Sequence, residues 1–344
     1  NINFDGLKSL NSNTDFQDID QIQIEATDIN FFVDDFTFAE AVSATPPSIT
    51  FTDINKTFGD ANFNLGATSN SAGAITYAVV SGGTGTATLS GTDNKTVTLG
   101  NAGTVTIRAT QAANGIYSSG TKDITLTIGK ANQTITFGAL ASKLLGDSPF
   151  GLTGSANSGL TVTYASSNNA VATVSGSTVT IVGIGSTNIT ATQAGNSNYN
   201  AATNIIQALA VKSTPTLTIS GATNITSSSA TLHGTITSGG NTTITERGFV
   251  YGNGGNPTLV DGFSTKVVVS SSNSTYNANI TGLTSPLTYY YRAYVISELG
   301  TTYSPADDVN EEFSVLKLAQ TITFGALVNK NLGEAPFSLT GTAS

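Results

Sequence analysis

Cysteine and methionine are both absent from this 344-residue sequence. Without cysteine the chain can form neither disulfides nor thiolate metal sites. Methionine is missing even at position 1, so we expect the numbering to begin within a mature or cleaved chain. No apolar run approaches the roughly 18–20 residues needed to span a membrane, and no signal peptide is visible. We therefore expect no membrane span in this segment, and any anchor or export signal to lie outside it.

Charged residues are also scarce, at 10% of the chain against roughly 25% in an ordinary soluble protein. Threonine, serine, asparagine and glycine take their place. This composition argues against disorder, because disordered chains combine high charge with few β-branched residues. It favours half-exposed strands and tight turns instead. A chain of this length is too long for one core, which predicts two to four domains.

The acidic residues are concentrated at the start of the chain. Residues 1–40 hold nine acidic residues and one lysine, whereas the rest of the chain holds 13 acidic and 12 basic residues. The formal charge of −9 therefore comes almost entirely from the opening segment, which we interpret as a separate kind of module. Nucleic-acid binding requires clustered lysine and arginine, so this balance argues against a nucleic acid as partner.

The sequence also repeats itself. The octamer at 133–140 recurs letter for letter at 320–327, and residues 145–154 are closely matched by 332–341. A looser copy begins at Ile49. Self-similarity of this kind indicates a modular array. Only about 25 residues of the last copy are present, so we expect the chain to be part of a longer protein.

Short alternating runs predict six strands in each of two consecutive repeats, 45–130 and 131–212. In the first repeat we expect strands at 48–52, 75–79, 86–90, 96–99, 103–111 and 123–128. In the second we expect them at 134–137, 161–166, 172–175, 178–182, 186–193 and 204–211. Six or seven short strands in about 80 residues, with turn residues between them, indicate an antiparallel sandwich. No stretch shows the 3.6-residue apolar period of a helix.

Residues 213–317 form a module of another type. Its alternating segments are at 230–236, 247–251, 266–270 and 276–280, followed by a tyrosine-rich run within 283–295. A strand through that run places Tyr289, Tyr291, Ala293 and Val295 on one face and Tyr290, Arg292 and Tyr294 on the other. Tyr289 follows a leucine-rich turn, where the hydroxyl of a tyrosine corner would bond back to the backbone.

Several of these features resemble known families. The Ile-Thr-Phe opening and the Gly-Asp/Glu…Phe-x-Leu element of 45–130, 131–212 and 318–344 are similar to bacterial immunoglobulin-like repeats, as is the Ala-Thr-Gln…Tyr close of the first two. Residues 213–317, with Glu-Arg-Gly-Phe-Val-Tyr-Gly, resemble a fibronectin type III-like module. Residues 1–44 resemble the closing strands of a jelly-roll-like β domain. This combination is typical of large secreted surface adhesins of gliding bacteria that use type IX secretion. The resemblance implies an all-β chain of tandem immunoglobulin-like antiparallel β-sandwiches.

No motif in the sequence predicts catalysis. His233 is the only histidine, it lies in a predicted strand, and no nucleophile-elbow motif accompanies it. The glycine-rich stretches 81–85 and 252–256 lack the lysine and the following helix that phosphate binding needs, so we interpret them as turns. We therefore expect that the protein is not an enzyme and requires no cofactor.

Calcium is the one ligand that the sequence suggests, because Ca²⁺ binds carboxylate, amide and carbonyl oxygens. Two acidic groups could supply them, and a solvated acidic surface is the alternative for both. The candidate ligands are Asp15, Asp18, Asp20, Asp34 and Asp35 near the start, and Asp307, Asp308, Glu311 and Glu312 near the end of the third module. The recurring Asp60, Asp147 and Glu334 are interpreted differently, as turn residues whose carboxylates bond to nearby backbone N–H groups.

The tyrosines allow two interpretations as well. Tyr290 and Tyr294, with Arg292 between them, could form an exposed platform on which a sugar stacks. In a sandwich, cross-strand packing is the favoured interpretation.

These observations predict a stalk or adhesin segment of a secreted bacterial cell-surface protein, which spaces and presents a binding domain and bears load. Two alternatives remain: a self-assembling extracellular filament, and non-catalytic accessory modules of a secreted polysaccharide-active enzyme. The expected partners are surface glycans or other cell-surface proteins, the secretion machinery, and further copies of the chain if filaments form.

Overall fold

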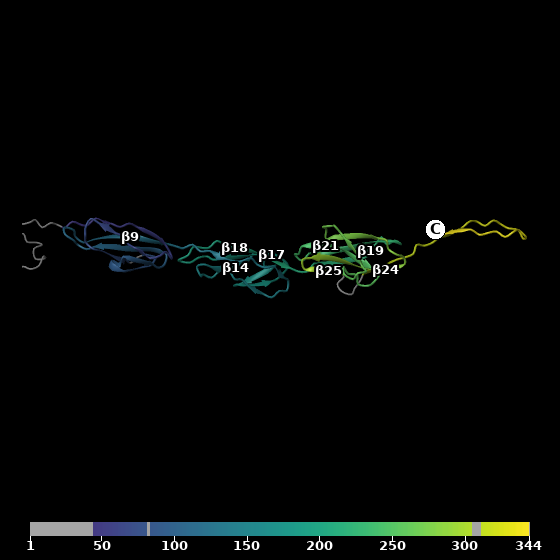
Figure 1. The fold of residues 1–344 in the computed structure, drawn as a ribbon, viewed down its shortest axis with the longest axis horizontal. Helices are drawn as coiled ribbons and strands as arrows, with labels where there is room; N and C mark the ends of the chain where they lie inside the picture. The colour runs from purple at the N-terminus through teal and green to yellow at the C-terminus, as the bar shows by residue number, and fades with distance from the viewer. Residues whose placement is uncertain (1–43, 81–82, 305–310, 344) are drawn as a thin grey trace, which may run out of the picture. The chain divides into compact units, whose positions relative to one another are not determined.

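A computed structural model of the protein describes residues 44–80, 83–304 and 311–343. These residues are almost entirely β-strands and turns, with one short 3-10 helix, Thr92–Asn94. Figure 1 shows the strands gathered into successive packed sheets. The described part of the chain contains no helix long and apolar enough to cross a membrane. The predicted jelly-roll end at 1–44 falls almost wholly outside the described residues.

The chain divides into two compact units. The first unit contains repeat 1, which we define as 45–130, and also residues 131–133 and the loop Ala194–Ala201 of repeat 2. The second contains the rest of repeat 2 (131–212), the third module (213–317) and the following hairpin.

Repeat 1 is an antiparallel sandwich with one parallel edge. Its strands are β1 (Ile49–Thr50), β2 (Ile54–Thr57), β3 (Phe63–Asn64), β4 (Thr68–Ser69), β5 (Ile75–Val80), β6 (Ala87–Ser90), β7 (Thr96–Leu99), β8 (Gly103–Gln111) and β9 (Gly120–Gly129). The larger sheet has the order β2-β9-β8-β5 and the smaller β3-β7-β6. Alternate residues of both sheets, among them Val97, Ile107 and Leu126, are fully buried between them. All six strands predicted for this repeat are confirmed.

Repeat 2 has the same order of strands. They are β10 (Ile135–Thr136), β11 (Lys143–Leu144), β12 (Phe150–Gly151), β13 (Ser155–Ala156), β14 (Thr163–Ser166), β15 (Ala172–Ser175), β16 (Thr178–Ile181), β17 (Gly185–Thr192) and β18 (Ile205–Lys212). The sheets β11-β18-β17-β14 and β12-β16-β15 correspond strand for strand to those of repeat 1. Their shared core includes Ile189 and Leu209, both with no exposed surface. The six predicted strands of repeat 2 are confirmed too.

The third module is a sandwich of different topology. Its strands are β19 (Thr216–Thr223), β20 (Ser229–Ser238), β21 (Ile244–Gly252), β22 (Thr265–Val268), β23 (Thr275–Thr281), β24 (Leu287–Ser297), β25 (Gly300–Ser304) and β26 (Glu311–Val315). One sheet is β19-β20-β23; the other is β22-β21-β24-β25, with β26 also paired to β24. The predicted face of Tyr291, Ala293 and Val295 lies in the core. Tyr289 forms the predicted corner, since its hydroxyl accepts the Thr284 N–H at 2.9 Å.

The last described segment is a hairpin of β27 (Ile322–Phe324) and β28 (Gly341–Ala343). Its register, with Ile322 opposite Ala343, matches that of β10 and β13, where Ile135 lies opposite Ala156. Ile135 is 7% exposed, whereas Ile322 is 67% exposed. The hairpin therefore has the backbone pairing of an immunoglobulin-like repeat, and its apolar side chains remain uncovered within the described residues.

Candidate functional site: the terminal strand pair of each repeat

An edge strand near the start of each repeat runs parallel to the last strand. In repeat 1, β2 pairs with β9 over four residues, from Ile54 opposite Leu126 to Thr57 opposite Gly129. In repeat 2, β11 pairs with β18 over two residues, Lys143 and Leu144. We call each of these the terminal pair, because its strands lie next to the incoming and outgoing ends of the repeat.

Parallel pairing gives the terminal pair a particular response to tension. The incoming chain pulls on the start of β2, and the outgoing chain pulls on the end of β9. In a parallel pair these two points lie at opposite ends, so the pull slides the strands past one another. The hydrogen bonds of the ladder then share the load and must break together. In an antiparallel pair pulled from one end, the bonds would break in succession.

A tight turn fixes the far end of each terminal pair. The Asp60 carboxylate accepts the Thr57 N–H at 2.9 Å, and the Asp147 carboxylate accepts the Leu144 N–H at the same distance. The glycine before each aspartate has a positive φ, 88° at Gly59, a conformation that costs glycine little. The predicted turn role of Asp60 and Asp147 is thus confirmed. Glu334 differs, because its carboxylate contacts the side chains of Asn331 and Lys330.

The residue that follows β2 and the residue that follows β11 each add one hydrogen bond to the ladder of the terminal pair. Phe58 N–H donates to the Gly129 carbonyl at 2.9 Å, and Leu145 N–H donates to the Lys212 carbonyl at 2.8 Å. Between β1 and β2 the chain passes from the sheet of β1 to the larger sheet, where β2 is the edge strand. In repeat 1 this crossover is fixed by Asp53, whose carboxylate accepts the Thr125 N–H of β9 at 2.8 Å.

A lysine on each edge strand also lies over a phenylalanine of the next strand. Lys56 Nζ is 4.7 Å from the ring centre of Phe63, and Lys143 Nζ is 4.8 Å from that of Phe150. The corresponding Lys330 lies 5.7 Å from the ring of Phe337. Such contacts contribute about 0.5–1 kcal/mol at exposed sites. Sequence reasoning missed this pair, although a lysine seven positions before a phenylalanine in every copy was a visible signal.

One tyrosine in each repeat binds the backbone of a loop through its hydroxyl group. The Ala67 N–H donates to the Tyr77 hydroxyl at 2.9 Å, and the Tyr164 hydroxyl donates to the Gly154 carbonyl at 3.1 Å. Tyr77 is only 5% exposed. The aligned tyrosines therefore have a structural role, because each holds onto the core the loop that precedes β4 in repeat 1 or β13 in repeat 2.

The third module is built differently at its ends. Its first strand, β19, pairs with β20, and its last described strand, β26, pairs antiparallel with β24. Since these strands belong to separate sheets, the described residues of this module form no parallel terminal pair.

The predicted calcium ligands are mostly outside the described residues. This applies to Asp15, Asp18, Asp20, Asp34, Asp35, Asp307 and Asp308. Glu311 and Glu312 lie on β26, opposite Tyr291 and Tyr290. Burial, and secondarily the charge of Glu311, raise the pKa of Tyr291 to about 12. No group of three potential metal ligands occurs among the residues that the structure describes, and the calcium site stays a prediction.

The prediction of an exposed tyrosine platform is wrong, and the prediction of cross-strand packing is confirmed. Tyr294 has no exposed surface, Arg292 is 5% exposed and Tyr290 is half-buried, so both faces of β24 are covered around Tyr294. The Tyr294 hydroxyl donates to Glu246 at 2.8 Å, and Lys266 forms an ion pair with that carboxylate. Lys266, and then Tyr294, lower the pKa of Glu246, whereas burial raises the pKa of Tyr294. The Arg292 guanidinium lies 4.5 Å from the ring centre of Tyr303.

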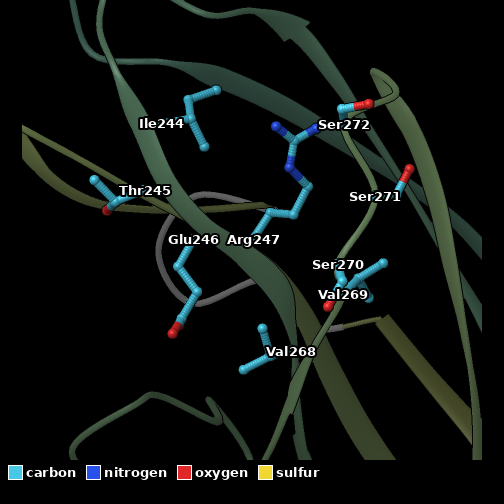
Figure 2. A pocket seen from close by; sticks show the side chains of 9 residues that line it. All are labelled: Ile244, Thr245, Glu246, Arg247, Val268, Val269, Ser270, Ser271 and Ser272. Carbon is cyan, nitrogen blue, oxygen red and sulfur yellow. The ribbon is translucent and has the colours of Figure 1, made fainter.

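His233 lies half-buried on β20, where its Nε2 is 2.8 Å from the Thr223 hydroxyl. A shallow groove of about 370 Å³ lies elsewhere in the module, between the start of β21 and the end of β22. Figure 2 shows Arg247 and Glu246 leaving β21 in opposite directions, with serines along the facing segment. Arg247 Nη1 donates to the Asn273 carbonyl at 2.7 Å. The groove offers hydroxyl groups and one guanidinium.

The loop between β21 and β22 is ordered by Asp261. Its carboxylate accepts the backbone N–H groups of Thr258, Phe263 and Ser264 and the Ser264 hydroxyl. Burial pushes the pKa of Asp261 upward, but these hydrogen bonds outweigh it and lower the pKa from 3.8 to about 2. The Leu259 N–H also donates to the Tyr303 hydroxyl at 3.0 Å. The loop is thus held at two points.

This loop should make the stability of the third module depend on pH. The Asp261 carboxylate binds protons less readily in the folded state, so it stabilises the fold above about pH 4 and loses that effect as the pH falls to about 2. We expect Asp261→Asn to cost about 1 kcal/mol at pH 7. The difference from wild type should vanish near pH 2 in urea unfolding. A difference that stays constant over this range would contradict the assignment.

No protein-family model and no curated protein matches the sequence. Solved structures that are similar include a multidomain fragment of titin, at 14% identity, covering 80% of this chain and 100% of that chain with a TM-score of 0.32. Drosophila N-cadherin EC1-4 is 11% identical, covers 76% of this chain and 74% of that one, and gives a TM-score of 0.30. The FN1-FN3 domains of chicken CNTN1 are 11% identical, cover 79% and 100%, and give 0.23. At these scores no relationship is established, and the fold rests on the sheets described above.

Proposed function

We propose that the chain is a load-bearing spacer within a large adhesion-type extracellular protein. The observation that supports this proposal is the terminal pair, which recurs at the same place in repeats 1 and 2. A ladder loaded in shear resists a pull that acts on the two ends of a domain. The proposed role is mechanical and non-catalytic.

Single-molecule stretching of the 344-residue chain tests the proposal. Repeat 1 has four residue pairs in its terminal pair and repeat 2 has two, so we expect repeat 1 to unfold at the higher force. The third module, which forms no such pair among its described strands, should unfold at the lowest force. If the third module proved the strongest, the terminal pair would not be the element that bears load.

We propose further that the protein belongs to a bacterial cell surface and is exported by the type IX pathway of a gliding bacterium. The support is the sequence resemblance alone. Localisation of the natural protein by surface labelling of intact cells tests this, and labelling only after lysis would contradict it. The proposed partners are surface glycans or cell-surface proteins, which binding of the chain to a glycan array would test.

Calcium at the two acidic groups is also proposed, as a means of stiffening the ends of the modules. Thermal unfolding with millimolar calcium and then with chelator is the test. A midpoint that does not change would leave these residues as a solvated surface.

A filament subunit is the second candidate, in which copies of the chain would join by strand exchange. Concentration-dependent assembly of the 344-residue chain would support the filament. A monomer at all concentrations would exclude it for this chain.

A further inference from the structure

The two junctions that flank repeat 2 are each held by a loop of the downstream module. At the first junction, the loop Ala194–Ala201 of repeat 2 belongs to the same compact unit as repeat 1. The linker residue Ala131 donates its N–H to the Asn198 carbonyl and accepts the Asn200 N–H, both at 2.9 Å. At the second junction, the Ser213 N–H donates to the Gly240 carbonyl at 2.8 Å. In both cases the linker backbone is fixed.

An asparagine of that loop then reaches back to the upstream module. Asn198 Oδ1 accepts the Ala102 N–H at 2.9 Å, and its Nδ2 donates to Asn101 Oδ1 at 3.1 Å. Asn241 Nδ2 donates to the Gly185 carbonyl at 2.8 Å and to the Val211 carbonyl at 3.1 Å. Although the two loops come from modules of different topology, the two asparagines bind at equivalent positions of repeats 1 and 2.

This position is the end of the ladder that β8 forms with β9 in repeat 1 and that β17 forms with β18 in repeat 2. We call it the open ladder end. Gly103 begins β8 and Gly185 begins β17, with φ values of 139° and 135°. Backbone groups at the end of a ladder lack the partner that a further pair would provide. An asparagine amide carries both an acceptor and donors, so it can satisfy an N–H in repeat 1 and carbonyls in repeat 2.

A lysine of the upstream module reaches forward at the same junctions. Lys130 Nζ donates to the Asn196 carbonyl at 2.7 Å, and Lys212 Nζ lies 2.7 Å from Glu298 Oε2. Lys130 and Lys212 are the last residues of their repeats. At the first junction Tyr199 also packs on Phe58, with ring centres 5.4 Å apart.

We infer that the open ladder end of each immunoglobulin-like repeat is a docking surface for a loop of the next module of the same chain, recognised by one asparagine and assisted by the terminal lysine. We call this arrangement the junction clasp: Lys130 with Asn198, and Lys212 with Asn241. The inference rests on the proposed spacer function and adds to it that a loop of the following module is held on the open ladder end of each repeat. A loop of an immunoglobulin-like repeat and a loop of the third module both bind this surface, so the asparagine side chain determines which loops can dock.

Distance measurements between spin labels test the clasp, and the absence of cysteine makes the labelling specific. Lys122→Cys and Ala201→Cys place labels on exposed positions of repeat 1 and of the loop Ala194–Ala201, which lie in one compact unit of the 344-residue chain. We expect a narrow distance distribution in this parent. Asn198→Ile should at least double its width, since isoleucine, which repeat 1 has at the equivalent position 116, offers no amide. Lys130→Met should broaden it less, and Asn188→Ala, an exposed asparagine on β17, should leave it unchanged.

The second junction gives an independent test with labels at Asn204 and Asn279 and the variant Asn241→Ala. The clasp is overturned if the parent distribution is already as broad as that of the variants. It is also overturned if Asn198→Ile and Asn241→Ala leave the width unchanged while circular dichroism shows a folded chain. Either failure would leave the spacer proposal standing, because a flexible chain of load-bearing modules still has shear-loaded terminal pairs. That proposal depends on the stretching experiment alone.

Discussion

Leu126→Ala is expected to unfold repeat 1 at a temperature about 10 °C or more below wild type while the rest of the chain melts as before. Leu126 has no exposed surface and lies on β9 opposite Ile54 of the terminal pair. Removing a buried leucine side chain typically costs 2–5 kcal/mol, from the lost transfer free energy and the cavity left behind. In a domain of 60–100 residues each kcal/mol shifts the midpoint by roughly 4–8 °C.

The effect should remain local because the buried residues form three separate clusters, one for each sandwich. Differential scanning calorimetry of the chain would show one transition shifted and the others in place. Thr127→Ala is the matched control, since Thr127 is the exposed neighbour on the same strand and should change the midpoint little. A shift of every transition together would mean that the modules unfold as one cooperative unit.

The sequence predicted the strands of the main sheets well, because alternation over four or more residues carries the signal. The strands β8 and β17 were found in this way, and so was the tyrosine-rich β24. The two-residue strands β3 and β12 could not be found, since two residues have no period and their pairing depends on partners more than 25 residues away. The strand β2 was missed for a related reason, because it is distinguished by its parallel partner β9.

The candidate site was only partly predictable. Repetition located the turns of Asp60 and Asp147, and a turn aspartate has a physical role that can be stated from sequence. Burial of both faces of β24 was less visible, because it depends on Tyr303 and Lys266, which contact the outer face from neighbouring strands. The junction clasp lay beyond sequence reasoning altogether, since asparagine is common in this chain and only its place at an open ladder end gives it a function.

Phe58→Pro should remove the mechanical advantage of repeat 1. The Phe58 N–H donates to the Gly129 carbonyl and is the last bond of the terminal pair before the turn. Proline has no N–H, so the ladder loses one of the few bonds that share the load. We expect the unfolding force of repeat 1 to fall from the highest in the chain to about that of repeat 2. This drop would also identify which unfolding event belongs to repeat 1.

The control is Phe58→Ala, which removes the ring and its contact with Tyr199 but keeps the N–H. The difference between the proline and alanine variants therefore isolates the hydrogen bond. Calorimetry should show a much smaller difference, since a net backbone hydrogen bond contributes only about 0.5–1.5 kcal/mol at equilibrium. A force that falls equally in both variants would assign the resistance to the aromatic contact. A large loss of force at a small cost in equilibrium stability is the result that a ladder loaded in shear requires, because the bond acts on the path of extension rather than on the stability of the core.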